Sequence, residues 1–141
     1  MMSITAASMG WEAWEPVALP GFDLLTRRGR EAARRYLMKM DPDFVAMAPR
    51  CTEWSQIQNI NQRTPMQVRG LRRRRKETLI VLSFFDEVAQ WQQERGRHGD
   101  RTAWMLESPL KSLAWRQAPI QASMGMSGVG AVVTDACVWE I

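Results

Sequence analysis

Two short apolar runs, separated by a helix-length segment, constrain the fold of this chain most. The runs are DFVAMA, residues 43–48, and TAWMLE, residues 102–107. Neither run alternates between apolar and polar residues, and this pattern is typical of a strand buried on both faces of a parallel sheet. Two strands that pair in parallel need a crossover connection, which is usually a helix. The sequence therefore predicts a β-α-β unit with a right-handed crossover.

The segment between the runs carries three signals for the start of a helix. Thr64 is a candidate N-cap, Pro65 stands at the first helical position, and Gln67 completes a capping box. Apolar residues then recur at helical spacing. We predict a helix that runs to about Arg95 and stops at Gly96.

Other segments continue the alternation of strand and helix. The apolar run in 17–25 is broken by Pro20 and Gly21, which predicts a strand that ends in a turn. A helix capped by Thr26 in 27–40 and a loop in 49–63 follow. Further along are a short helix in 108–115, capped by Ser108 with Pro109 at its first position, a flexible Gly-rich connection in 121–130 and a last strand in 131–141. This order predicts an α/β fold, a partial Rossmann-like sheet of about four mostly parallel strands with flanking helices. We expect a flexible tail in 1–16 and one incomplete domain in 17–141. A last strand at the end of the chain would leave a sheet edge open to a second copy or to another chain.

The bulk composition fits one globular domain with a basic surface. The chain has 141 residues, 45% of them hydrophobic, a net charge of +4 and a pI near 9.7. Most of the basic residues are arginine, which pairs with phosphate and stacks on bases, so DNA is a candidate partner. A solvated basic surface without a partner is the alternative interpretation.

Cysteine and histidine content argues against a metal site and a disulfide framework. The chain has two distant cysteines, Cys51 and Cys137, and the single histidine His98. These residues cannot form a tetrahedral zinc site of the usual spacing, and they favour a reducing compartment. The chain shows neither a signal-peptide pattern nor an apolar run of the roughly 18 residues that a membrane span needs. We therefore expect an intracellular protein, nuclear or cytoplasmic, without a metal and without a membrane segment.

Cys51 and Glu107 are the candidate catalytic residues. Cys51 follows the first apolar run and Glu107 ends the second. The ligand site of a parallel sheet lies at the carboxyl ends of its strands, so both side chains are expected at one edge. A thiol and a carboxyl group facing one crevice are a nucleophile and a general acid. Two alternatives stay open, namely that Cys51 is buried and inert, and that Glu107 caps the next helix.

The residues around Cys51 and Glu107 resemble the motifs of the DNA cytosine-5 methyltransferases. In PDFVAMAPRCTEWS the cysteine, the aromatic residue and the serine are in register with the family's nucleophile motif, and TAWMLESP resembles the strand that ends in its glutamate. The likeness is greatest to a divergent branch that we associate with mobile-element or polyprotein-type reading frames. There the matching segments are GFDLLT (21–26), ESP (107–109) and Trp115. The resemblance covers roughly residues 20–117.

The resemblance implies a reaction and a set of roles. The thiolate of Cys51 would attack C6 of a flipped-out cytosine, and Glu107 would hold N3 of the ring. The methyl group would come from S-adenosylmethionine, and Pro49 would lie beside this cofactor. Asp23 could reach the adenosine hydroxyls, as an acidic strand-end residue does in nucleotide-binding folds. Ser55 would contact the nucleic acid, whereas Arg50, which departs from the family pattern, would either bind a phosphate or block the pocket.

The sequence departs from the family pattern at three places. Arg50 replaces the proline before the cysteine, Ser108 replaces the asparagine after the glutamate, and a Gly-rich strand-to-helix turn for the cofactor is missing. These departures favour a degenerate form of the family over an intact one. A non-catalytic basic module that binds nucleic acid or another partner is the alternative function.

The densest charge run is RGLRRRRK, residues 69–76. Arg72, Arg73, Arg74 and Arg75 would point around the predicted helix in all directions. They predict either a ridge that contacts phosphates, with salt-dependent affinity, or a solvated start of the helix. Four of the seven tryptophans are expected in the core rather than as base-stacking platforms, namely Trp54, Trp91, Trp104 and Trp115.

Overall fold

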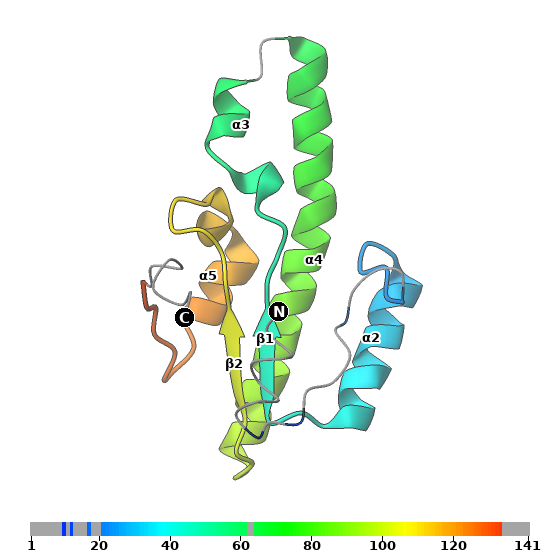
Figure 1. Ribbon diagram of the computed structural model, residues 1–141, viewed down its shortest axis with the longest axis vertical. Coiled ribbons are helices and arrows are strands. Elements are labelled where there is room, and N and C mark those ends of the chain that lie inside the picture. The colour runs from blue at the N-terminus through cyan, green and yellow to red at the C-terminus, as the bar shows by residue number, and fades with distance from the viewer. Residues whose placement is uncertain (1–9, 11, 13–16, 18–20, 62–63, 134–141) are drawn as a thin grey trace.

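The computed structural model describes residues 10, 12, 17, 21–61 and 64–133. Its elements, in chain order, are α2 (Arg27–Met40), β1 (Phe44–Met47), the 3₁₀ helix η1 (Thr52–Trp54), α3 (Ile57–Ile60), α4 (Pro65–Arg97), β2 (Ala103–Leu106), the 3₁₀ helix η2 (Leu113–Arg116) and α5 (Ala118–Met124). Figure 1 shows the long helix α4 along the whole molecule, with the two strands beside its lower half. The chain is therefore a mixed helix and strand protein with a small parallel sheet and flanking helices.

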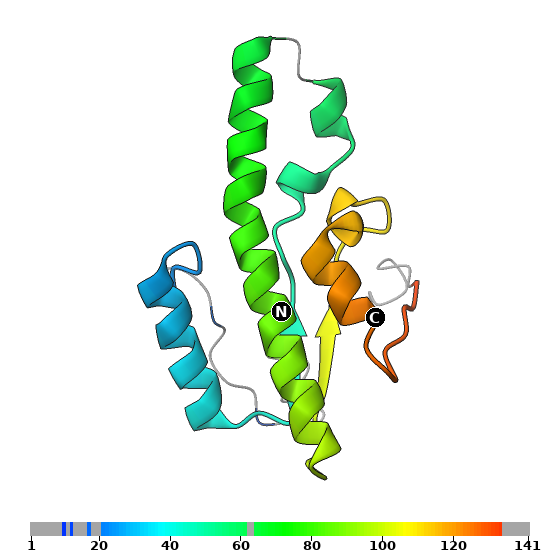
Figure 2. The same ribbon diagram turned by 180° about the vertical axis from the view of Figure 1, so that it is seen from behind.

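The sheet confirms the predicted β-α-β unit. β1 and β2 pair in parallel, from Phe44 opposite Ala103 to Met47 opposite Leu106, and α4 connects them. In Figure 2 α4 lies in front of the strands and β2 lies to the right of β1, which is a right-handed crossover.

The predicted capping box starts α4. The Thr64 side chain accepts a hydrogen bond from the Gln67 N–H at 3.2 Å, and the Gln67 side chain accepts one from the Thr64 N–H at 3.0 Å. The predicted end of the helix is wrong by two residues, because α4 continues through Gly96 to Arg97. Inside the helix, Gly96 lies close to Thr102, whose hydroxyl would be 3.2 Å from an added Cβ. A single glycine lowers helix propensity without forcing an end.

Arg95 ties together the amino-terminal ends of both strands. Its guanidinium forms ion pairs with Asp41 at 3.0 Å and Asp100 at 3.2 Å, and it donates to the carbonyl of Pro42 at 2.9 Å. Asp41 and Pro42 precede β1, whereas Asp100 precedes β2. One side chain of α4 therefore holds the starts of β1 and β2 next to each other.

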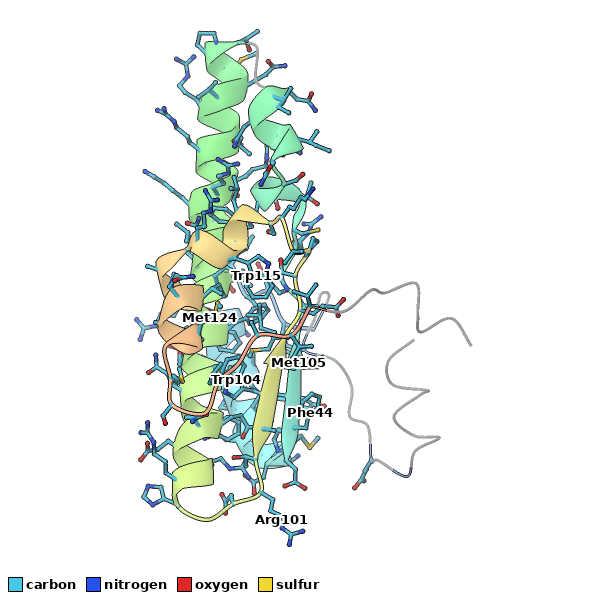
Figure 3. The ribbon with its side chains drawn as sticks, turned by 90° about the vertical axis from the view of Figure 1, so that its left-hand side faces the viewer. Phe44, Arg101, Trp104, Met105, Trp115 and Met124 are labelled. Atoms are coloured by element: carbon cyan, nitrogen blue, oxygen red, sulfur yellow. The ribbon has the colours of Figure 1, made fainter. Side chains whose placement is uncertain are left out.

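The prediction that both strands are buried on both faces is wrong for this sheet. Met47 is buried and Trp104 packs against the core, whereas Phe44 and Met105 are 37% and 42% exposed. Figure 3 shows Trp104 on the side of the sheet toward α4 and Phe44 on the opposite side. The reason is that α4 and α5 lie on the same face of the sheet, as Figure 2 also shows.

Two core clusters connect the helices to the sheet. The first joins α2, β1 and α4 through Ala33, Met47, Phe84, Val88 and Ala89. The second joins η1, α4, η2 and α5 through Trp54, Leu82, Ala114 and Ile120, with Leu106 of β2 packed against it. The second cluster therefore lies at the carboxyl ends of the strands and supports the segments that follow them.

Three predicted segments, two connections and one helix, have a different local structure. The loop expected in 49–63 contains η1 and α3. The helix expected to begin at Ser108 begins later, as the 3₁₀ helix η2, and its cap is Ser112, whose hydroxyl accepts from the Ala114 N–H at 3.2 Å. The Gly-rich connection expected in 121–130 instead contributes the second half of α5, where Ser123 is buried.

The two outer strands of the predicted sheet are only partly covered by the described residues. Residues 21–25 of the first form turns, and residues 131–133 of the last carry no strand. Val17 forms a bend and packs against the first cluster. Residues 18–20 and 134–141, like most of the expected tail in 1–16, lie outside the described residues. The helix expected in 27–40 is present as α2, and Thr26 caps it by accepting from the Gly29 N–H at 3.0 Å.

Candidate functional site

The carboxyl ends of β1 and β2 bring Cys51 and Glu107 to the same edge of the sheet, as predicted. Glu107 directly follows β2, and its N–H donates to the carbonyl of Met47, the last residue of β1, at 2.8 Å. Cys51 comes four positions after Met47, and a chain of that length reaches at most about 14 Å. The segment after β1 and the segment after β2 therefore start side by side.

Cys51 is a free, exposed thiol at the start of η1. The interpretation of Cys51 as a buried cysteine is therefore wrong. Its thiol makes no capping hydrogen bond, while its carbonyl accepts from the Trp54 N–H at 3.1 Å. The backbone at Cys51 is thus held by η1, and the side chain stays accessible to a substrate.

Glu107 is exposed and directly follows β2, at the same edge of the sheet as Cys51. The alternative that it caps the next helix does not hold, because Ser112 supplies the side-chain cap of η2. The Glu107 backbone is fixed by its bond to Met47 and its side chain is open to solvent. A carboxyl group in this position can donate to or accept from a ligand that reaches Cys51.

Three buried polar atoms at this edge have no hydrogen-bond partner among the described residues. They are Oε2 of Glu53, Nε1 of Trp54 and Oγ of Ser108. Glu53 and Trp54 belong to η1, which follows Cys51, and Ser108 follows Glu107. Because buried polar atoms are normally paired, water or a polar ligand is the ordinary explanation for such a group. Sequence reasoning missed Glu53; the only signal was a charged residue between the cysteine and the tryptophan of the nucleophile motif.

The loop residues that the resemblance associated with nucleic acid or cofactor lie in the same segment. Arg50 is exposed and Pro49 is half-buried, both in the extended stretch between β1 and η1. Ser55 is half-buried at the end of η1. These three residues therefore flank Cys51, and Arg50 adds a positive charge that is open to solvent.

Asp23 helps to form the turn that starts α2. Its carboxylate accepts from the Leu25 N–H at 3.1 Å, and its carbonyl accepts from the N–H and hydroxyl of Thr26 at 3.0 and 2.9 Å. Figure 1 shows that α2 runs opposite to β1, so this turn lies toward the carboxyl ends of the strands. Gly29 approaches the Asp23 backbone so closely that an added Cβ would lie 1.9 Å from the Asp23 carbonyl oxygen.

The described residues contain no Gly-rich strand-to-helix turn of the kind that cradles S-adenosylmethionine. The close backbone approach at Gly29 is filled by the protein's own Asp23 turn.

The four successive arginines of α4 divide between two environments. Arg72, Arg73 and Arg74 are exposed, and Arg73 forms one ion pair with Glu77 at 3.8 Å. Arg75 is half-buried, and burial lowers the pKa of its guanidinium below the ordinary value. The four side chains thus point in different directions around the helix, as predicted, and Arg75 is the one that faces the protein. Near them, Met66, Arg69, Gly70 and Arg73 line an open hollow of about 310 Å³.

The tryptophans pack against the protein interior. Trp54 is 3% exposed in the second cluster, Trp115 packs against that cluster, and Trp104 packs against the first. Trp91 is half-buried beneath Arg95, whose guanidinium carbon lies 5.0 Å from the ring centroid. The expectation of core tryptophans is thus confirmed for Trp54, Trp104 and Trp115.

The fold and this edge define a parallel β-α-β protein with a thiol and a carboxyl group at the strand ends. No protein-family model, no curated protein and no solved structure matches the chain. Within the part of the chain that the structure describes, no helix is long and apolar enough to cross a membrane. In the same residues, no group of three or more His, Cys, Asp or Glu side chains could hold a metal ion.

Proposed function

We propose that the edge formed by Cys51 and Glu107 is a cytosine-binding site of the DNA cytosine-5 methyltransferase type, on a partial Rossmann-like fold. One observation carries the proposal. The N–H of Glu107 donates to the carbonyl of Met47, so the segments that bear the thiol and the carboxyl group begin side by side. Both side chains are exposed, as a site for a macromolecular substrate requires.

The proposed chemistry is reversible addition to the pyrimidine ring. The thiolate of Cys51 forms a bond to C6, the electron pair of the C5–C6 double bond shifts to C4–C5, and the C4–N3 double-bond pair moves onto N3, which takes a proton from the protonated Glu107 carboxyl group. C5 then takes a proton from water, which leaves hydroxide. Loss of the original C5 proton to that hydroxide, return of the N3 proton to Glu107 and cleavage of the S–C6 bond restore cytosine and the thiolate. The base must leave the stack because a duplex hides C6.

S-adenosylmethionine is the methyl donor that the family resemblance implies, and it would supply the group transferred to C5. Because the described residues contain no Gly-rich strand-to-helix turn for this cofactor, the proposal covers only addition and hydrogen exchange at the ring. An exchange experiment therefore tests the proposal without depending on the donor.

Release of tritium from DNA labelled at C5 of cytosine measures this reaction. We expect the protein to release tritium into water with or without S-adenosylmethionine. Cys51→Ala should abolish the release, and Glu107→Gln should slow it at least tenfold. Cys137→Ala removes the other cysteine, which lies outside the described residues, and should leave the rate unchanged. The proposal fails if the wild-type protein releases no tritium, or if Cys51→Ala releases it at the wild-type rate.

A second candidate function is nucleic-acid binding by the exposed arginines of α4. The supporting observation is that Arg72, Arg73 and Arg74 are exposed and successive in sequence. Among the described residues, one long ion pair, between Arg73 and Glu77, offsets their charge. Such a cluster can neutralise phosphates and release counterions. This function needs neither Cys51 nor Glu107.

The salt dependence of DNA binding tests the second candidate. Replacing Arg72, Arg73 and Arg74 with Gln should reduce the slope of log affinity against log salt by about 2 to 3, one for each lost phosphate contact. Arg28→Gln together with Arg35→Gln on α2 removes exposed charge elsewhere and should change the slope less. An unchanged slope in the triple variant would exclude this surface as the DNA-binding site.

A further inference from the structure

Arg75 contacts three residues of the segment that follows Cys51. Its Nε donates to the carbonyl of Glu53 at 2.9 Å, and its Nη2 donates to Oδ1 of Asn59 at 2.9 Å. Its guanidinium carbon lies 5.6 Å from the centroid of the Trp54 ring. One side chain of α4 therefore binds η1 and α3 at the same time.

Hydrogen bonds fix the backbone on both sides of Cys51. On one side, the chain is fixed where the Met47 carbonyl accepts from Glu107. On the other side, it is fixed where the Glu53 carbonyl accepts from Arg75. Cys51 lies between these two points, and its own carbonyl accepts from the Trp54 N–H. The position of the thiol thus depends on the sheet and on the guanidinium together.

We infer that Arg75 is a positioning residue that holds the 51–59 segment on α4 and so fixes Cys51 at the edge of the sheet that also carries Glu107. The inference that this matters for catalysis rests on the proposed function, while the contact itself does not. A guanidinium suits this task because its planar fork gives two directed donors and a face that stacks on an aromatic ring. A lysine has one ammonium group and cannot reproduce both bonds and the stacking.

The effect of removing Arg75 should be local. The Trp54 side chain also packs against Leu82, Ala114 and Ile120 in the second cluster, so it stays buried without the guanidinium. The backbone at Glu53 and the side chain of Asn59 lose their partner. The segment should therefore loosen around η1 and α3, while the sheet and α4 stay folded.

Amide hydrogen exchange tests the contact without any substrate. Arg75→Gln and Arg75→Lys should both speed exchange of the Trp54 and Ser55 amides at least tenfold, with exchange of the central turns of α4 unchanged. Arg74→Gln is the matched control, because Arg74 is the exposed neighbour of Arg75, and it should behave like the wild type. The inference is overturned if both Arg75 variants exchange the Trp54 and Ser55 amides at the same rate as the wild-type protein.

The tritium-release assay then tests the catalytic consequence. We expect both Arg75 variants to lower kcat at least tenfold with KM within about twofold, since the DNA surface is intact and only the thiol is misplaced. Unchanged kcat together with faster amide exchange would overturn the positioning role. If the wild-type protein releases no tritium while the amide exchange responds as expected, the proposed function fails and the contact stands. The two failures are thus distinguishable.

Discussion

The close approach of Gly29 to Asp23 gives a sharp prediction for the variant Gly29→Ala. A Cβ at this position would lie 1.9 Å from the carbonyl oxygen and 2.5 Å from the carbonyl carbon of Asp23. These are backbone atoms, so a side-chain rotation cannot relieve the clash. The carbonyl oxygen must move from 1.9 Å to at least 3.4 Å from the Cβ, a separation of about 1.5 Å, before an ordinary contact is restored.

The cost follows from what holds the Asp23 carbonyl in place. It accepts from the N–H and the hydroxyl of Thr26, and the same hydroxyl accepts from the Gly29 N–H to cap α2. Separation therefore breaks the cap, which costs about 1 kcal/mol, in addition to about 1–3 kcal/mol for overpacking. We expect a loss of about 2–4 kcal/mol, which is on the order of 10 °C in Tm for a chain of this size.

Thermal and urea unfolding followed by circular dichroism measure this loss. Gly70→Ala is the matched control, because its Cβ would meet only Arg74 Nη1 at an ordinary 3.5 Å inside α4. That substitution should stabilise the protein by about 0.5–1 kcal/mol through helix propensity. The reasoning is refuted if Gly29→Ala unfolds within about 0.5 kcal/mol of the wild type, or if both variants lose the same stability.

Two further predictions concern stability. Ser123 is 2% exposed, and its hydroxyl donates to Asp86 at 2.6 Å, which joins α5 to α4. Ser123→Ala should therefore lower the free energy of unfolding in urea by about 1–3 kcal/mol. A loss below about 0.5 kcal/mol would contradict this prediction. A hydrogen bond from Arg97, and to a smaller extent one from His98, lowers the pKa of Glu94. The contribution of Glu94 to stability is therefore present above its ordinary pKa of 4.5 and is lost as the pH falls below that value. Glu94→Gln should therefore reduce the drop in Tm between about pH 6 and pH 3, and an undiminished drop would argue against this bond.

The β-α-β unit was predictable because its signals are local and agree with one another. Thr64 and Gln67 form the capping box that the sequence predicts, and the two apolar runs form paired strands. Burial of the strands on both faces was not predictable, because a continuous apolar run does not show how many helix layers cover a sheet. The exposed Phe44 and Met105 demonstrate the difference.

Short elements with weak signals were missed for another reason. α5 lies partly in a segment rich in Gly and Ser, and tertiary packing of Ile120 and Ser123 outweighs that local composition. For η2, both Ser108 and Ser112 precede a helix-like stretch, and sequence alone does not rank them as caps. The geometry of the structure favours Ser112.

The candidate site was predictable to the level of the sheet edge. The strand-end positions of Cys51 and Glu107 follow from parallel pairing. The inward direction of Arg75 was not predictable, because four successive arginines carry no signal for the one that faces the protein. Likewise, the unpaired buried Glu53 oxygen depends on packing that involves distant elements.

The length of the connection between the two strands determines the order in which this protein can fold. Phe44 pairs with Ala103, far along the chain, so closing the sheet without α4 would carry a large loop entropy. Helix formation is fast and local, whereas pairing across such a separation is slow. We therefore expect α4 to form first and the strands to meet on it afterwards. On this pathway Cys51 and Glu107 become neighbours only in the last step, so partly folded molecules would contain the thiol without the site.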